Sequence, residues 1–143
     1  YNNAKTNDFE GIDKTITWLS NNIPNNSEAC LIHNDFKFDN LMFEIGEEIN
    51  VNAVLDWEMA TIGDPLMDLG TSLGYWIHET DPEIIKKLKL NITFLKGIPS
   101  REQLVDLYGE KSGRSVKNVI FYFVFFYIYK FTIYKIFFFI IFA

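Results

Sequence analysis

Several side chains able to handle phosphate occur on one short stretch of the chain, from His33 to Asn40. Asp35 could take a proton from an attacking hydroxyl, Lys37 could neutralise charge on a transferred group, and Asn40 offers an amide oxygen. A second carboxylate, that of Asp56, follows an apolar segment further along the chain. Mg²⁺ takes oxygen ligands, usually one or two from the protein. The set predicts phosphoryl transfer, with Asn40 and Asp56 as candidate metal ligands.

Three short apolar segments are needed to bring these groups together. Residues 29–32 lead into the loop, residues 41–43 leave it, and residues 51–55 end immediately before the second carboxylate. The polar stretch between the last two segments contains a glycine and is typical of a turn, so these two segments are predicted to pair as an antiparallel hairpin. Such a hairpin returns Asp56 to the neighbourhood of Asn40.

These motifs follow one another in an order that a known family also has. From His33 the spacing is His-x-Asp-x-Lys-x-x-Asn, which resembles the catalytic loop of protein kinases. Asp56 is followed by Trp-Glu, and Gly63 opens the sequence Gly-Asp-Pro-Leu-Met-Asp-Leu. Together they resemble the aminoglycoside phosphotransferase and choline kinase-like family, in particular the kinase-like domains fused to, or encoded near, acyl-CoA dehydrogenases. The resemblance covers roughly residues 12–133 and is dense from 31 to 76.

The resemblance implies an α+β fold, namely a protein-kinase-like C-terminal lobe that is mostly helical and has a small β-hairpin at the active site. It implies that the complete enzyme uses ATP and Mg²⁺ to phosphorylate a hydroxyl of a small molecule. In this chain the catalytic base would be Asp35, the phosphate contact Lys37, and the metal ligands Asn40 and Asp56. The acceptor could be a hydroxyacyl thioester, or an aminoglycoside-like or choline-like alcohol, and the sequence does not choose.

Two further residues are expected to support this site. His33 is interpreted as a structural residue that bonds the loop backbone and does not pass protons. Asp68 lies in a helix predicted to start with Asp64 as its cap and Pro65 in the first position. The apolar face of this helix carries Leu66, Leu69, Leu73 and Trp76. The helical period places Asp68 away from that face, in solvent. The resemblance implies instead that Asp68 points inward and holds the loop backbone. We adopt this second interpretation.

Composition narrows the class of protein and its partners. The 143 residues are 48% hydrophobic and 22% charged, which predicts a single soluble domain over residues 1–143. The net charge is −6, and no cluster of Lys and Arg interleaves with aromatic residues, so nucleic acid is not expected as a partner. Cys30 is the single cysteine, which excludes an intrachain disulfide and predicts an intracellular, cytoplasmic location.

The remaining helices are marked by their ends and by their period. Phe9, Ile12, Ile16 and Leu19 recur at helical spacing. Ser100 followed by Gln103 three residues later predicts a capping box, and the helix it opens should end at Gly113. A short helix is expected after Pro82.

The last part of the chain, residues 119–143, contains seventeen Val, Ile or Phe residues and is interrupted by Lys130 and Lys135. A buried helix and a membrane anchor both accommodate its length, and two central lysines nearly cancel the apolar gain of insertion. Because the resembled family has a long aromatic helix here, residues 119–133 are expected in the core. Residues 134–143 depart from the family pattern and form an atypical apolar tail.

An N-terminal lobe is expected to be missing from this chain. Kinase-like folds cover the phosphates with a glycine-rich loop and a strand lysine, and nothing before Asp35 supplies either. The chain is therefore interpreted as part of a longer or assembled enzyme, whose bare surface should favour self-association. Two other functions remain open on the sequence, a non-catalytic pseudokinase or scaffold lobe and a tail-anchored membrane protein.

Overall fold

The computed structural model describes residues 11–25, 28–87, 91 and 93–142, and for Ile84 and residues 134–142 it describes the backbone alone. The elements in chain order are α1 (Ile12–Asn21), β1 (Cys30–Ile32), η2 (Phe38–Asn40), β2 (Leu41–Ile45), β3 (Ile49–Val54), η3 (Trp57–Met59), β4 (Thr61–Gly63), α2 (Leu66–Tyr75), α3 (Glu83–Lys87), α4 (Arg101–Ser112) and α5 (Val119–Phe142). Helices and short antiparallel strands share one chain, so the α+β class predicted from the sequence is confirmed.

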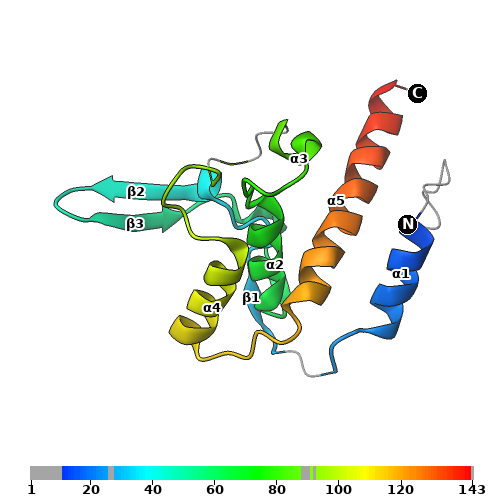
Figure 1. Cartoon of the computed structure of the whole chain (residues 1–143), viewed down its shortest axis with the longest axis horizontal. Coiled ribbons are helices and arrows are strands. Elements are labelled where there is room, and N and C mark those ends of the chain that lie inside the picture. The colour runs from blue at the N-terminus through cyan, green and yellow to red at the C-terminus, as the bar shows by residue number, and fades with distance from the viewer. Residues whose placement is uncertain (1–10, 26–27, 88–90, 92, 143) are drawn as a thin grey trace.

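Helix α2 lies at the centre of the molecule, between the strands on one side and α5 on the other (Figure 1). Its leucines form the core with the first turns of α5. The buried members of this core are Leu66, Leu69, Leu73, Val119 and Tyr122. Each such side chain, when fully buried, stabilises the fold by about 1.5–3 kcal/mol, so the contact between α2 and α5 is the main apolar contact that holds the site's scaffold.

Two glycines allow α2 and α5 to approach closely. A Cβ atom at Gly70 would lie 2.7 Å from the carbonyl carbon of Tyr122, and one at Gly74 would lie 2.1 Å from the ring of Phe126. No side chain of any size fits in these spaces. The two helices are therefore in direct contact from Gly70 to Gly74 of α2 and from Tyr122 to Phe126 of α5, which helps to position the next turn of α5.

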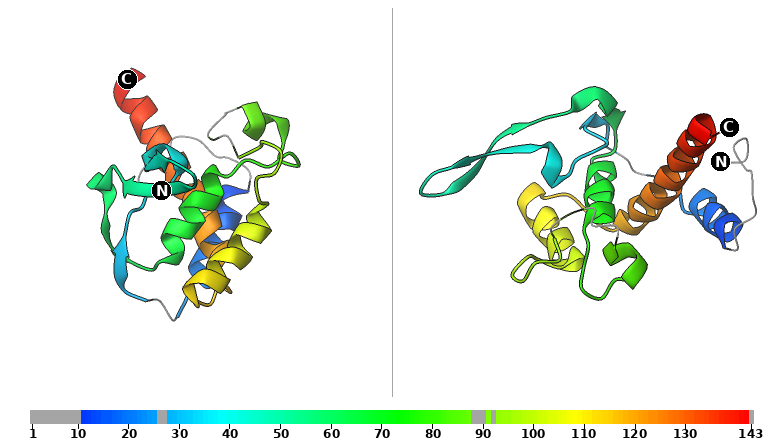
Figure 2. Two further views of the ribbon diagram at one scale, coloured as in Figure 1. Left: turned by 90° about the vertical axis from the view of Figure 1, so that its left-hand side faces the viewer. Right: turned by 90° about the horizontal axis from the view of Figure 1, so that it is seen from above.

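The strands form two separate pairs. β2 and β3 make the antiparallel hairpin predicted from the sequence, with a turn at residues 46–48 and an irregularity between Met42 and Phe43. Both strands are longer than predicted, and β3 ends one residue earlier, at Val54. The hairpin projects away from the helices (Figures 1 and 2).

The second pair, β1 with β4, was not predicted as a pair. In its antiparallel register Cys30 lies opposite Gly63, and Ile32 lies opposite Thr61. β4 has three residues, which is too short to show an alternating pattern in the sequence. The pairing brings the residues that precede α2 next to the strand that leads into the loop with Asp35.

Most predicted helix ends are confirmed. Asp64 Oδ1 accepts a hydrogen bond from the Leu66 amide at 2.8 Å, although the helix starts one residue after Pro65. Ser100 and Gln103 form a reciprocal capping box, and α4 is followed by Gly113 at φ 68°. α3 begins directly after Pro82, as expected.

One helix end differs from the prediction, since α2 stops at Tyr75. Trp76 follows the helix in an extended conformation, yet its side chain is buried and its indole NH donates to the Pro99 carbonyl at 2.8 Å. The predicted start of the first helix at Phe9 lies outside the described residues, and α1 is described from Ile12.

Helix α5 has the core position predicted for residues 119–133. Val119, Tyr122 and Phe126 are buried, each one turn from the next. In the part of the chain that the structure describes, no helix is long and apolar enough to cross a membrane. The environment of the side chains in 134–143 lies outside that description.

Candidate active site

The polar face of α2 points at the loop from His33 to Asn40. Asp68 accepts hydrogen bonds from the backbone amides of His33 and Asn34, at 2.8 and 2.7 Å. One turn later Ser72 donates to the Phe36 carbonyl at 2.8 Å. Asp68 therefore has the inward orientation that the family resemblance implied, and the solvated position that helical period alone would give is wrong.

His33 is almost fully buried, and backbone groups engage both of its ring nitrogens. Its Nδ1 accepts from the Asp35 amide at 3.2 Å, and its Nε2 lies 2.7 Å from the Leu55 carbonyl oxygen. Because Nδ1 accepts, Nε2 carries the proton and donates it to that carbonyl. The ring packs against Trp57, with centroids 4.8 Å apart. This geometry agrees with a structural interpretation of His33, which ties the loop to the end of β3.

The carboxylate of Asp35 is buried and receives hydrogen bonds at both oxygens. Oδ2 lies 2.6 Å from Lys37 Nζ and 3.3 Å from the Asn40 amide nitrogen. Oδ1 accepts from the Tyr75 hydroxyl at 2.8 Å and lies 3.3 Å from Lys130 Nζ. Groups from the loop thus hold one oxygen, and groups from α2 and α5 hold the other.

The surroundings of Asp35 keep it ionised. Burial alone would raise the pKa of this carboxyl, because it disfavours the charged form. Hydrogen bonds from Lys37 and Tyr75, together with the positive charges of Lys130 and Lys37, outweigh burial and lower the pKa to about 2. Asp35 is therefore an acceptor of hydrogen bonds at neutral pH.

Two ammonium groups share one aromatic ring beside this carboxylate. Lys37 Nζ lies 5.1 Å from the centroid of the Tyr75 ring, and Lys130 Nζ lies 5.2 Å from the same centroid. Lys130 also lies 5.8 Å from the Phe126 ring. A cation over a ring face is attracted by the ring quadrupole. With one Asp and two Lys, this cluster carries a net charge of +1.

The two predicted metal ligands lie at adjoining chain segments. The Leu55 amide donates to the Asn40 carbonyl at 2.8 Å, so Asp56 follows a residue bonded directly to Asn40. Asp56 has φ 65°, a left-handed conformation that Asp tolerates better than most residues, and its side chain is exposed. The left-handed turn separates β3 from η3.

The donor types at these two positions fit Mg²⁺. The Asn40 amide nitrogen is used in hydrogen bonds to Asp35, which leaves its amide oxygen as the atom that could bind a cation. Asp56 supplies a carboxylate, and hard oxygen ligands of this kind suit Mg²⁺. Among the described residues there is no group of three or more His, Cys, Asp or Glu that could hold a metal ion. A site with one carboxylate and one amide does not depend on such a group.

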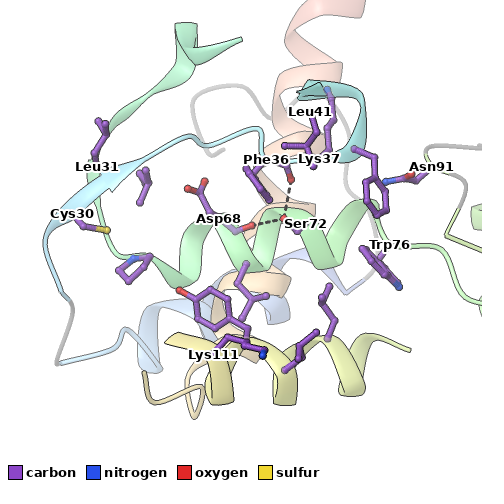
Figure 3. A pocket seen from close by; sticks show the side chains of 17 residues that line it. Cys30, Leu31, Phe36, Lys37, Leu41, Asp68, Ser72, Trp76, Asn91 and Lys111 are labelled. Atoms are coloured by element: carbon purple, nitrogen blue, oxygen red, sulfur yellow. Dashed lines mark hydrogen bonds between the residues drawn. The ribbon is translucent and has the colours of Figure 1, made fainter. Parts of the chain in front are cut away.

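A pocket of about 500 Å³ adjoins the loop on the side facing α4 (Figure 3). Its walls come from β1, the loop, α2 and α4, and are mainly apolar. The side chains that line it include Phe36, Lys37, Phe38, Leu69, Trp76 and Leu104. Figure 3 shows Ser72 of α2 among the lining residues, hydrogen-bonded to the backbone of Phe36 and Asp68. The pocket therefore places apolar surface next to the cationic side chain of the loop.

Sequence reasoning missed two residues that contact Asp35. Tyr75 lies seven residues after Asp68, on the same face of α2, so a polar stripe at helical spacing was present in the sequence as a signal. The signal for Lys130 was weaker. A lysine in an otherwise apolar helix carries a charge that is costly to bury unless a partner is present. That signal was interpreted only as a cost of membrane insertion.

The sequence matches proteins of one family. A model of the phosphotransferase enzyme family matches residues 1–91. Acyl-CoA dehydrogenase family member 11 of Mus musculus is 43% identical over 104 residues, which cover 71% of this chain and 13% of that protein. Acyl-CoA dehydrogenase family member 10 of Mus musculus is 36% identical over 109 residues, which cover 76% of this chain and 10% of that protein. The chain thus spans a small fraction of the length of these relatives.

A solved structure also resembles this chain. It is the crystal structure of a candidate aminoglycoside phosphotransferase from Ralstonia eutropha, which superposes with a TM-score of 0.66 and is 31% identical. The match covers 86% of this chain and 37% of that one. The likeness confirms the kinase-like fold expected from the sequence motifs.

Proposed function

We propose that this chain, which belongs to the phosphotransferase enzyme family, forms the catalytic lobe of an enzyme that transfers the γ-phosphoryl group of ATP to a hydroxyl of a small molecule. The family match and the solved neighbour support a small-molecule phosphotransferase fold. The reaction, the nucleotide and the acceptor are the proposal.

The observation that carries the proposal is the buried, ionised carboxylate of Asp35 with Lys37 2.6 Å from it. Phosphoryl transfer needs an acceptor for the hydroxyl proton and a cation for the transferred group within a few ångströms of each other. Both occur here on one loop, and Asp68 holds the backbone of that loop from α2. This arrangement supports a catalytic lobe over the alternative of a non-catalytic scaffold lobe.

In the proposed reaction Asp35 accepts a hydrogen bond from the acceptor hydroxyl. This bond orients the hydroxyl oxygen toward the γ-phosphorus of ATP. The bond from phosphorus to the bridging oxygen breaks, a bond from phosphorus to the acceptor oxygen forms, and ADP leaves. The hydroxyl proton passes to Asp35 and then to solvent. The neighbours of Asp35 lower its pKa, so the carboxylate is ionised before the reaction and can orient the hydroxyl. This suits a loose transition state with late proton loss.

Lys37 would contact the transferred group, and Asn40 and Asp56 would hold Mg²⁺. When bound, Mg²⁺ neutralises charge on the nucleotide phosphates and brings them to the site. The hydrogen bond between Leu55 and Asn40 fixes the two ligand-bearing segments relative to each other, so neither ligand depends on a freely moving loop.

The apolar pocket beside Lys37 favours an acceptor that has an apolar part. A hydroxyacyl thioester has one, and the relatives are named acyl-CoA dehydrogenase family members, which supports the same choice. An aminoglycoside-like alcohol would place ammonium groups against apolar walls and near a cluster of net positive charge. We therefore propose a hydroxyacyl thioester as the acceptor class.

The test is phosphotransfer by the full-length protein with Mg·ATP and a panel of acceptors. The panel holds hydroxyacyl thioesters of increasing chain length, an aminoglycoside and choline, and phosphorus NMR identifies any phosphoester formed. We expect a phosphoester with the thioesters and a rise of kcat/KM with chain length. Transfer to the aminoglycoside or choline alone would overturn the acceptor class, and the absence of any phosphoester would overturn the proposed function.

A further inference from the structure

We propose that Lys130 of α5 is a positioning residue of this site. Together with Tyr75 it keeps Oδ1 of Asp35 in place while Lys37 turns from Asp35 to the nucleotide phosphates. The inference rests on the proposed function. It assigns a role to a residue of α5 that lies 95 positions along the chain from Asp35.

The two oxygens of Asp35 differ in what holds them. Lys37 contacts Oδ2 from the same loop, only two residues away, and a lysine on a flexible stem can turn to a phosphate that binds nearby. Tyr75 and Lys130 contact Oδ1 from α2 and α5. A departure of Lys37 would leave Oδ2 with the Asn40 amide nitrogen as its remaining contact at 3.3 Å, so an acceptor hydroxyl could take the place of Lys37 while Oδ1 keeps its partners.

Lys130 is held by rigid parts of the fold. It lies one turn after Phe126, whose ring fills the space over Gly74 of α2. Its side chain is 18% exposed, and its ammonium group lies over both the Tyr75 and the Phe126 ring. The contact between Lys130 and Asp35 is thus set by helix packing, and it does not change when Lys37 turns from Asp35 to the nucleotide phosphates.

Charge gives Lys130 a second effect on the reaction. After Lys37 turns away, the negative Asp35 would face an incoming phosphoryl group that is also negative. A cation fixed beside Asp35 offsets this repulsion in a half-buried site, where charge interactions are stronger than in water. Two lysines are therefore needed, one for the phosphate and one for the carboxylate.

The test compares Lys130→Met, Lys130→Arg and Tyr75→Phe in the full-length protein. Lys117→Met is the matched control, since Lys117 is exposed and precedes the same helix. We expect Lys130→Met to lower kcat by about tenfold or more while the KM for ATP changes by less than about twofold. Lys130→Arg should restore most of the activity, and Tyr75→Phe should lower kcat in the same way but less. Lys117→Met should match the wild type.

A structural measurement separates this inference from the proposed function. In crystals of Lys130→Met with Mg·ATP, the Asp35 carboxylate should adopt more than one orientation, and in the wild type it should adopt one. If the wild type transfers phosphate and Lys130→Met has the same kcat, the inference is wrong and the proposed function stands. If the wild type is inactive with all acceptors, the proposed function fails, and the Asp35 orientation still decides whether Lys130 holds it. Should Lys130→Met not fold, Lys130→Gln takes its place, and an unchanged kcat in that variant would overturn the inference.

Discussion

Asp35 is buried, charged and surrounded by donors that come from different parts of the chain. Burial raises the pKa of a carboxyl, and only the nearby hydrogen bonds and ammonium groups reverse that effect. The carboxylate is thus kept ready to accept a hydrogen bond from a hydroxyl. A buried charge without partners would be too costly to keep, so the cations and the carboxylate have to be explained together.

The role of Asp56 as a metal ligand can be tested by a single substitution. Asp56→Ala in the full-length protein should weaken Mg²⁺-dependent binding of ATP by about tenfold or more, because the lost interaction runs through the ion. Metal-free binding should change little. The measurement is isothermal titration of ATP with Mg²⁺ and with EDTA. Equal weakening in both titrations would mean that Asp56 only shapes the turn before η3.

Sequence reasoning identified the loop residues because their chemistry is local. Asp35 and Lys37 lie two positions apart, and any fold of the loop keeps them close. The contacts to Asp35 from Tyr75 and Lys130 span 40 and 95 positions. They exist only because α5 packs against α2, and nothing in the spacing of the sequence fixes which face of α5 meets the loop.

At the scale of the elements, the close packing of α2 against α5 depends on glycine residues of α2. Gly70→Ala should destabilise the fold by about 1–3 kcal/mol, because the new Cβ would meet the Tyr122 backbone, which cannot move aside as a side chain can. Gly109→Ala in α4 is the matched control, since its Cβ would have an ordinary contact 3.5 Å from Val116. That change should be neutral or stabilise by about 0.5–1 kcal/mol. Urea unfolding measures both, and equal effects would contradict the close packing of α2 with α5.

Helix α4 is attached by an ion pair to the segment between α2 and α3, and the stability that this pair adds should depend on pH. Arg101 donates to both oxygens of Asp81, each at 2.7 Å, and also to the Leu73 carbonyl. The hydrogen bond from Arg101 lowers the pKa of Asp81 below its ordinary 3.8, burial opposes this, and the His78 amide adds to it. A carboxyl with a lowered pKa adds stability above its unfolded pKa and loses it as the pH falls through the folded value.

The corresponding prediction is that Asp81→Asn costs about 1–3 kcal/mol of unfolding free energy at pH 7. The difference from the wild type should shrink as the pH falls below about 4. Glu83→Gln is the control, since it breaks a solvent-exposed pair with Lys86 worth about 0.5 kcal/mol or less. Urea unfolding at several pH values tests this, and a difference independent of pH would contradict the assignment of the effect to Asp81.

Element predictions from the sequence succeeded where a local rule applies. The capping box at Ser100, the Gly113 end of α4 and the turn before β3 are each specified by a few neighbouring residues. β4 was missed because its three residues pair with β1, which is remote in sequence. The end of α2 at Tyr75 was missed because Trp76 continues the apolar period, although its indole is held by the Pro99 carbonyl.

For the whole molecule, the exposed face of the hairpin is the feature that bears on association. Phe43 lies opposite Val51, and Ile45 opposite Ile49, on adjoining strands. These four side chains are 40–85% exposed, and the hairpin projects from the body (Figure 2). A contiguous apolar face of this kind marks a surface that associates with another. We expect the isolated chain to elute from size exclusion as larger than a monomer.

The variant that tests this expectation is Ile45→Asp with Ile49→Asp. Charges on the face should return the isolated chain to a monomer, as measured by light scattering. Ile23→Asp is the control, because Ile23 is 63% exposed but lies outside the hairpin. If the wild-type chain is monomeric, or if the control dissociates it equally, the hairpin face is not the surface of association.

The central claim is that Asp35 orients the hydroxyl in a phosphotransfer reaction, and Asp35→Asn tests it most directly. The change keeps the size of the side chain and removes its charge. We predict that kcat for transfer from Mg·ATP to the acceptor falls by about 10²–10⁴, because the amide neither orients the hydroxyl as a carboxylate does nor takes up its proton, and a positioned proton acceptor alone contributes about this much. The dissociation constant of Mg·ATP should stay within about threefold of the wild type, since Asp35 is assigned no contact to the nucleotide. A variant with near wild-type kcat would contradict the account.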